Sequence, residues 1–279
     1  MSLPLVSVII TAYNREKYIG DAIESVLQST YKNFELIIVD DGSTDNTRKI
    51  ISNYNNYSNV KTFFNPNNLG QFENRNYSAS LASGKYIKYL DSDDLLYKYG
   101  LEVMVDIMER YPDAGAAMNH GLLHDSEPYP IYLSPKDAYR AFFIKGGFPT
   151  AGPSGSIFLK EAFFSTGGFP KPYYVGTDII MLLKIASQYP ILKIQPGLIW
   201  YRQHDEQEMA IGNRNFDYIK NNNRQYLACL LDKNCPLNEL EIKQAVSLIK
   251  KTTLRKALSC LKHLKVKEAY YNLKAINLS

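Results

Sequence analysis

The sequence YLDSDDLLYK at residues 89–98 gathers negative charge at one point of the chain. Asp91, Asp93 and Asp94 follow directly on an apolar run that has the pattern of a buried strand. Three carboxylates this close repel one another unless a cation or hydrogen-bond donors lie between them. Oxygen-rich sites suit Mg²⁺ or Mn²⁺, which keep several waters and bridge protein to phosphate. The alternative is that Asp93 or Asp94 caps a helix that begins near Leu95, although one acid would be enough for that.

A second pair of acids, Asp40 and Asp41, ends the apolar run FELIIVDD at residues 34–41. An acid in this position after a Rossmann-like strand commonly accepts hydrogen bonds from a ribose or a base. The alternative is a turn that leads into a capped helix. The sequence contains neither the glycine-rich dinucleotide fingerprint nor the Walker phosphate loop. A bound diphosphate would therefore need another group to neutralise it, and a metal ion at DSDD would do this.

Strand-like and helix-like patterns alternate through the first 120 residues and must position these acids. Short apolar runs predict strands at residues 6–13, 34–41, 60–64, 85–91 and 114–119. Helical spacing predicts helices at residues 16–28, 43–54, 71–83 and 95–111. The alternation predicts an α/β fold, with a mostly parallel sheet covered by helices on both faces. Ligands of such sheets bind at the carboxyl ends of the strands, where Thr11, Asp40 and Asp91 lie.

The second half of the chain changes from mixed to helical patterns. We expect a helix near residues 135–144, a strand and a short helix within residues 152–169, a helix at residues 177–189 and a pair of strands at residues 191–204, broken at Pro196 and Gly197. Beyond about residue 212 the pattern is wholly helical. The sequence therefore predicts one α/β domain over residues 1–210 and a helical extension over residues 211–279.

The charge of the chain is unevenly distributed. The whole chain carries +4, but residues 243–279 hold nine Lys or Arg against the single acid Glu268. This tail is therefore +8, and residues 1–242 are −4. The mildly acidic body has no basic stripe with interleaved aromatic residues, which argues against nucleic acid as a partner. The basic helices of the tail either pack on the α/β domain or attach it to an anionic membrane surface.

The cysteines and the N-terminus bear on the compartment. Cys229, Cys235 and Cys260 match no zinc pattern and would leave an odd thiol if two of them were bridged. The start of the chain has no signal-peptide pattern, and no stretch reaches the roughly 20 apolar residues of a membrane span. We expect a reduced, cytoplasmic protein, held at the inner face of the membrane if the tail binds lipid.

Several motifs together resemble one enzyme family. They are TAYNREKY, VDDGSTDNT, NLGQFENRN, YLDSDD, GPSGS, GTD and YRQH. Their order and spacing over residues 5–205 resemble the inverting family 2 glycosyltransferases of the GT-A fold. The resemblance implies a Rossmann-like GT-A domain over residues 1–210 that binds a nucleotide sugar and carries the catalytic residues.

The resemblance assigns roles on the nucleotide side. Thr11, Tyr13 and Asn14 would line the nucleotide pocket, with the ring of Tyr13 against the base. Asp40 would hold the base, which is most often uracil in this family, and Arg75 would lie beside the nucleotide or the diphosphate. The alternatives are that Tyr13 closes the edge of the sheet and that Arg75 is a solvated helix residue.

The resemblance also assigns the reacting side. Asp91 would face the ribose or the sugar, and Asp93 would ligate the metal that bridges the two phosphates. Asp178 would be the general base, although many relatives carry Glu-Asp where this chain has Thr177 and Asp178. The alternative for both is a helix N-cap. His204 would lie on the diphosphate side as a second metal ligand, unless it is only a solvated loop residue.

Three further residues have more general assignments. Ser154 and Ser156 of GPSGS would border the acceptor pocket, although a Gly-Ser turn needs no function. Arg202 of YRQH is assigned a structural role, and Asp94 is left as a cap or as support for its neighbours.

The combined prediction is a metal-dependent inverting glycosyltransferase. It would use Mn²⁺ or Mg²⁺ to transfer a sugar from a nucleotide diphosphate donor, with UDP expected, to a hydroxyl of a glycan or lipid-linked acceptor in surface polysaccharide synthesis. One alternative is a catalytically silent nucleotide-sugar binding protein, which the missing Glu at position 177 suggests. A sugar nucleotidyltransferase is the other, but TAYNREKY lacks the glycine-rich loop that would hold a triphosphate.

Overall fold

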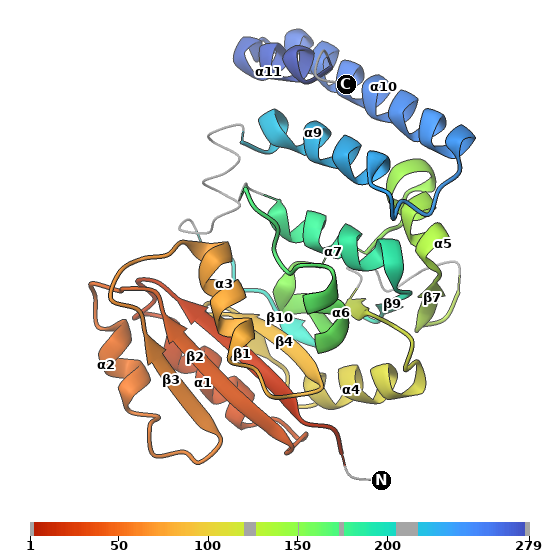
Figure 1. Ribbon diagram of the computed structural model, residues 1–279. Helices are drawn as coiled ribbons and strands as arrows, with labels where there is room; N and C mark the ends of the chain where they lie inside the picture. Colours follow the sequence, from red (N-terminus) through yellow and green to blue (C-terminus); the bar gives the residue numbers. More distant parts are fainter. Residues whose placement is uncertain (1–2, 120–126, 150, 173–175, 205–216, 277–279) are drawn as a thin grey trace. The chain divides into compact units, whose positions relative to one another are not determined.

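The computed structural model describes residues 3–119, 127–149, 151–172, 176–204 and 217–276 (Figure 1). The chain divides into two compact units. Unit 1 comprises residues 1–132, 149–169 and 189–202, and unit 2 comprises residues 133–148, 170–188 and 203–279. The chain leaves unit 1 for the last time after Arg202, near the predicted domain boundary at residue 210. Two earlier segments, residues 133–148 and 170–188, also belong to unit 2.

Unit 1 is built on an eight-stranded sheet in the order β3-β2-β1-β4-β8-β6-β9-β7. The strands are β1 Val6–Ala12, β2 Phe34–Asp40, β3 Val60–Phe64, β4 Tyr86–Asp91, β6 Ala116–Asn119, β7 Ile131–Leu133, β8 Ser156–Leu159 and β9 Ile191–Ile194. Strand β1 is parallel to β2 and β4, β2 to β3, and β6 to β9, whereas β8 runs antiparallel to both β4 and β6. The predicted mostly parallel α/β fold is confirmed.

Helices of unit 1 cover this sheet. They are α1 Ile19–Leu27, α2 Thr47–Ser52, α3 Gln71–Ser80, α4 Gly100–Arg110 and α6 Lys160–Ser165, with a 3₁₀ turn, η2, at Pro153–Gly155. Val8 and Ile10 of β1 share one buried cluster with the apolar faces of α1 and α4. Ile9, which points to the other face because side chains alternate along a strand, is also fully buried. Both faces of the strand are therefore covered, as its unbroken apolar run predicts.

Two predicted elements are wrong. The helix expected at residues 95–111 begins only at Gly100, because Leu95 and Leu96 form strand β5 (Leu95–Leu96) and pair antiparallel with β10 (Ile199–Trp200). Asp94 therefore does not cap a helix. The strand pair expected at residues 191–204 is also split, since β9 joins the large sheet beside β6 and β10 joins the small one.

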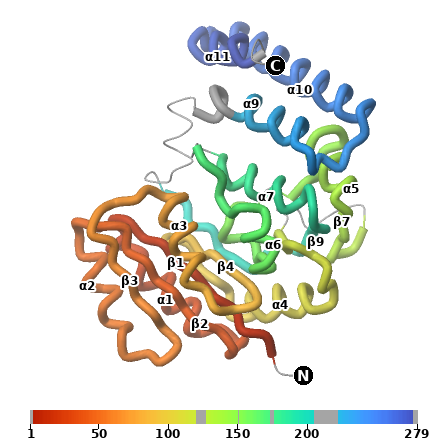
Figure 2. Tube along the Cα trace, viewed as in Figure 1, coloured from red at the N-terminus to blue at the C-terminus, as the bar shows by residue number. Residues whose placement is uncertain are grey.

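Unit 2 is helical, as predicted for the end of the chain, and Figure 2 follows its path. Its elements are α5 Pro135–Arg140, the π-helical turn η1 Ala141–Lys145, α7 Thr177–Gln188, α9 Asp217–Leu231, α10 Glu239–Lys262 and α11 Val266–Ile276. Residues 212–216 of the predicted helical stretch lie outside the described residues.

Side-chain contacts join the early helices of unit 2 to its C-terminal ones. The Tyr139 hydroxyl donates to the Leu183 carbonyl at 3.2 Å, which ties α5 to α7. Arg140 Nε donates to Glu241 Oε1 at 2.7 Å, which ties α5 to α10. The Phe142 ring lies edge-on against Tyr226 of α9 with centroids 5.1 Å apart. None of the described helices combines the length and the apolar character that a membrane crossing requires.

Candidate functional site

The carboxyl ends of three neighbouring strands bring the predicted residues of unit 1 together. In the sheet register, Thr11 of β1 lies opposite Asp91 of β4, and Ala12 lies opposite Asp40 of β2. Three segments far apart in the sequence therefore meet at one edge of the sheet, as the strand-end rule predicts.

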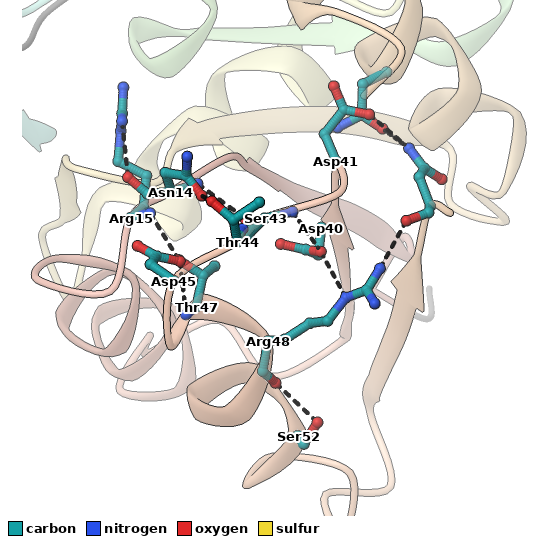
Figure 3. Close-up of polar contacts among 12 residues, drawn as sticks. Asn14, Arg15, Asp40, Asp41, Ser43, Thr44, Asp45, Thr47, Arg48 and Ser52 are labelled. Carbon is teal, nitrogen blue, oxygen red and sulfur yellow. Dashed lines mark hydrogen bonds and ion pairs between the residues drawn. The ribbon is translucent and has the colours of Figure 1, made fainter. Parts of the chain in front are cut away.

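Asp40 is fully buried and only partly satisfied (Figure 3). Its Oδ2 accepts hydrogen bonds from the Ser43 amide at 3.2 Å and from Arg48 Nε at 3.0 Å. Arg48 also donates through Nη2 to the Asn65 carbonyl at 2.7 Å, so it bridges β2 to the end of β3. Asp40 Oδ1 has no hydrogen-bond partner among the described residues. A buried acceptor without a donor is costly, so this atom could take a donor from a ligand.

Asp41, the next residue, has different contacts. One carboxylate oxygen accepts from Asn65 Nδ2 at 2.8 Å and from the Leu69 amide at 2.9 Å, and the other accepts from the Gly70 amide at 3.0 Å. Asp41 thus holds the loop after β3 against the end of β2. Gly42 follows with φ of +77°, and a Cβ there would lie 3.0 Å from the Asn67 backbone. Only glycine fits this tight turn.

The segment after β1 is fixed against the segment after β2, as Figure 3 shows. Asn14 adopts φ of 52°, accepts from the Thr44 amide at 2.8 Å and donates its own amide to Ser43 Oγ at 2.9 Å. The Arg15 amide donates to Thr47 Oγ1 at 2.7 Å. Tyr13 is exposed, so its ring is available to a ligand at this edge.

Asp91 is held from two sides. Its Oδ1 lies 2.6 Å from Arg75 Nη2, and its amide donates to Ser154 Oγ at 2.8 Å. Arg75 is only 5% exposed, and its guanidinium lies 5.8 Å from the ring centroids of both Phe72 and Phe169. The alternative of a solvated Arg75 is therefore wrong. This buried arginine orients Asp91 at the strand end.

Asp94 is buried among donors instead of capping a helix. Its Oδ1 accepts from the Arg202 amide at 3.2 Å, while Arg202 Nε donates to the Asp93 carbonyl at 2.9 Å. Arg202 also pairs with Asp21 at 3.0 Å, so its contacts fit the assigned structural role. Burial, reinforced by the negative charge of Asp91, raises the pKa of Asp94 to about 7.

Asp93 is the residue that the sequence predicts as a metal ligand. Its side chain is 13% exposed, and Oδ2 lies 3.8 Å from Arg15 Nε. Within the described parts of the chain, no three His, Cys, Asp or Glu side chains are grouped so that they could enclose a metal ion. A Mg²⁺ or Mn²⁺ ion commonly binds through one or two carboxylates together with substrate phosphates, so a single carboxylate fits it.

A buried lysine lies beneath this cluster and was missed in the sequence. Lys88 is fully buried in β4, and its Nζ donates to the carbonyls of Tyr89 and Ser154. Burial lowers the pKa of Lys88 to about 7, against the opposing effect of Asp91 and Asp94. A lysine inside the apolar run YIKYL, just before three acids, was the available signal.

The GPSGS turn is packed tightly beside β4. Ser154 and Ser156 are both buried, and Ser156 Oγ donates to the Gly152 carbonyl at 3.1 Å. A Cβ on Gly155 would collide with the Tyr201 hydroxyl and with Asn119 Oδ1. Both serines thus hold the turn in place, and a contact with an acceptor stays a prediction.

Asp178 and His204 belong to unit 2. Asp178 is half-buried in the first turn of α7, which begins at Thr177. His204 is half-buried at the end of the segment that follows β10. Their roles as general base and metal ligand stay predictions.

The chain is similar in sequence to known glycosyltransferases. Residues 7–164 match the family model described as Glycosyl transferase family 2. The chain is 33% identical over 211 residues to the UDP-Glc:alpha-D-GlcNAc-diphosphoundecaprenol beta-1,3-glucosyltransferase WfgD of Escherichia coli, covering 75% of this chain and 81% of that protein. An uncharacterised glycosyltransferase of Rickettsia felis is 33% identical over 191 residues, which cover 67% of this chain but only 31% of that longer protein.

Solved structures share the fold at low identity. TarS of S. aureus, residues 1–349, in complex with UDP-GlcNAc, superposes with a TM-score of 0.68 at 18% identity and covers 95% of this chain and 89% of that one. The mannosyltransferase PcManGT from Pyrobaculum calidifontis, in complex with GDP-Man and Mn²⁺, gives 0.67 at 17% identity, over 99% and 86%.

Proposed function

Because this chain belongs to glycosyl transferase family 2 and has the GT-A fold, we propose that it is a metal-dependent inverting transferase of sugars from nucleotide diphosphate donors. The acceptor is a hydroxyl of a glycan or lipid-linked saccharide in surface polysaccharide synthesis. The observation that carries the proposal is the strand-end site, where Thr11, Asp40 and Asp91 meet beside Asp93. WfgD supports the acceptor class, since its name specifies a saccharide linked to diphosphoundecaprenol.

We assign recognition of the nucleobase of the sugar donor to Asp40. Asp40 Oδ1 accepts no hydrogen bond from the residues that the structure describes, and the N3–H of uracil would supply a donor for it. Arg48 holds the other carboxylate oxygen in place. WfgD is named for UDP-glucose, and TarS binds UDP-GlcNAc, which supports UDP. PcManGT binds GDP-mannose, and guanine also offers ring N–H donors, so UDP and GDP must be compared directly.

The metal is assigned to Asp93. A Mn²⁺ or Mg²⁺ ion there would neutralise the charge that develops on the leaving diphosphate. Arg15, at 3.8 Å from Asp93, is a further cation at the same edge, and the Arg75–Asp91 pair keeps Asp91 directed toward the ribose or the sugar. PcManGT was solved with Mn²⁺, which supports a divalent ion without fixing its identity.

The general base is assigned to Asp178. Inversion at the anomeric carbon requires a carboxylate that takes the proton of the acceptor hydroxyl on the face opposite the departing diphosphate. Thr177 is buried and stands where the family resemblance implies a glutamate, so Asp178 is the carboxylate of this motif.

The test is UDP or GDP release from a panel of nucleotide sugars with Mn²⁺, together with thermal shift. A donor at 100 times its Kd should stabilise the folded protein by about 2.7 kcal/mol. We expect Asp178→Asn to keep this shift but to lower turnover by ~10²–10⁴-fold. Asp93→Asn should lose the metal dependence of the shift, and exposed Asp106→Asn on α4 is the matched control.

Two results would contradict the proposal. If no nucleotide stabilises the protein, the donor site is wrong. If donors bind in a metal-dependent way but no acceptor mixture supports turnover by the wild type, the catalytically silent binding protein is the better interpretation.

A further inference from the structure

The last two helices present apolar side chains to solvent in a regular pattern. In α10, Leu254, Leu258 and Leu261 are 45%, 56% and 44% exposed. Their spacing of four and three residues places them on one face of the helix. This row is separate from the packing face of α10, where Thr253 and Ala257 are buried.

The following helix repeats the pattern. Val266, Tyr270 and Leu273 of α11 have the same spacing and are 65%, 59% and 41% exposed. The packing face of α11 is again a different one, because Ala269 and Ala275 are buried. Each helix therefore buries one face within unit 2 and leaves a second apolar row uncovered in the described chain.

A basic row runs beside each apolar row. In α10 it consists of the exposed residues Lys251, Arg255 and Lys262, whose spacing of four and seven residues places them together on the face next to the leucines. In α11 it consists of the exposed residues Lys267 and Lys274. From residue 243 to the end of the chain the only acid is Glu268, which pairs with Lys265 at 3.7 Å.

We propose that these two apolar rows with their basic rows, here called the basic apolar surface, dock on an anionic lipid bilayer. Helices that lie in a membrane interface place leucine and aromatic side chains at the acyl boundary and lysines among the lipid phosphates. Each cation near an anionic leaflet adds to the attraction. A second copy of the chain is a poorer occupant, because a two-fold contact would bring the same lysines against one another.

The docking goes beyond the proposed transfer reaction, and the donor site lies entirely on other residues. It would bring a lipid-linked acceptor and the protein to the same surface. Vesicle binding and nucleotide binding are assigned to different residues and are tested with different variants. One proposal can therefore fail while the other holds.

The experiment is flotation of the full chain with vesicles of phosphatidylcholine alone or with 30% phosphatidylglycerol, at low and high salt. The wild type should float only with the anionic vesicles, and high salt should weaken binding because it screens the lysines. The triple variant Leu254→Gln, Leu258→Gln, Leu261→Gln should bind at least tenfold more weakly. The triple variant Lys251→Gln, Arg255→Gln, Lys262→Gln should also bind at least tenfold more weakly.

The matched control is Lys32→Gln, Lys98→Gln, Lys145→Gln, which removes the same charge from exposed positions elsewhere. It should bind within twofold of the wild type. All changed side chains are exposed, so circular dichroism, thermal unfolding and the nucleotide thermal shift should stay unchanged.

Several outcomes would overturn the inference. They are the absence of flotation with anionic vesicles, equal binding to both vesicle types, and equal loss in the control and the α10 charge variant. Concentration-dependent dimerisation that the leucine variant abolishes, without vesicle binding, would assign the surface to a second copy instead.

Discussion

At the scale of single residues, the site depends on pairs that hold one another in place. Asp40 and Asp41 are adjacent, yet their contacts differ. Asp40 Oδ1 has no partner in the described part of the chain, whereas Asp41 accepts three hydrogen bonds that fix a loop. The sequence predicts both acids at the strand end but not this division. It depends on the path of residues 65–70, which no local pattern specifies.

The contacts of Lys88 and Arg75 are the part of the site that the sequence does not predict. That Thr11, Asp40 and Asp91 would meet follows from strand order alone, because the ends of parallel strands share one edge. The Arg75–Asp91 pair depends on how α3 packs over the sheet, and the burial of Lys88 depends on the GPSGS turn covering β4. Both are tertiary contacts between segments that the sequence pattern treats as independent.

Lys88 gives a prediction for the pH dependence of stability. Its pKa is lowered from 10.5 to about 7 in the folded chain. Between these values the unfolded chain binds a proton at Lys88 that the folded chain does not, so folding becomes more favourable as pH rises. Relative to Lys88→Met, the wild type should gain up to about 1.4 kcal/mol of unfolding free energy per pH unit between pH 7 and 10.

The measurement is urea unfolding in EDTA at pH 6, 7, 8, 9 and 10. Below pH 7 the difference between wild type and Lys88→Met should be flat, because the lysine is protonated in both states. Lys85→Met removes an exposed lysine next to the same strand and should shift stability without this slope. A difference between wild type and Lys88→Met that does not change with pH would contradict a neutral buried amine.

At the scale of elements, β5 shows tertiary contact overriding local pattern. LLYKYGLEV has helical spacing, yet Leu95 and Leu96 are extended because β10 pairs with them. Leu96 is buried at 3% exposure, and Tyr99 donates its hydroxyl to the Gly197 carbonyl at 2.9 Å. Pairing partners more than a hundred residues away cannot be seen in a window of local sequence.

Two glycines of unit 1 helices should respond in opposite ways to alanine. A Cβ on Gly100, at the start of α4, would collide with the Leu198 carbonyl oxygen, whereas one on Gly20 in α1 would lie 3.8 Å from Ile50 Cγ2. Gly20→Ala should stabilise by about 0.4–1 kcal/mol, because alanine restricts the unfolded chain. Gly100→Ala should destabilise by about 1–3 kcal/mol, as overpacking does.

Urea unfolding of the two variants under identical conditions checks this pair. Both changes are glycine to alanine in a helix, so helix propensity cancels between them. Equal effects on the unfolding free energy would mean that the Leu198 carbonyl lies farther from Gly100 than the structure has it.

At the scale of the whole molecule, the chain passes between its two units more than once. The mostly parallel sheet and the helical end of the chain follow from the sequence, but the membership of residues 133–148 and 170–188 in unit 2 does not. Residues 133–148 pack on α9 and α10 through the contacts Phe142–Tyr226 and Arg140–Glu241. Amphipathic helices far apart in sequence give no local sign of which partner they choose.

A chain cut after residue 210, at the predicted domain boundary, is therefore expected to fold poorly. It would keep α5 and η1 but lose the helices that cover Phe142 and Phe143. We expect exposed apolar surface, dye binding and a broadened thermal transition, measured against the full chain. A sharp, cooperative transition at the temperature of the full chain would mean that residues 1–210 form an independent domain.

The antiparallel strand β8 sets an order of events during synthesis. It pairs with β4 on one side and β6 on the other, although it follows both in the sequence. Until Ser156–Leu159 leave the ribosome, the inner edges of these two strands have no partner in the finished sheet. At ~5–20 residues per second, the delay after β4 is on the order of several seconds. Because β9, the other partner of β6, is synthesised later still, the nascent chain passes through a stage in which β4 has one open edge and β6 has two. We expect chaperones to bind such edges.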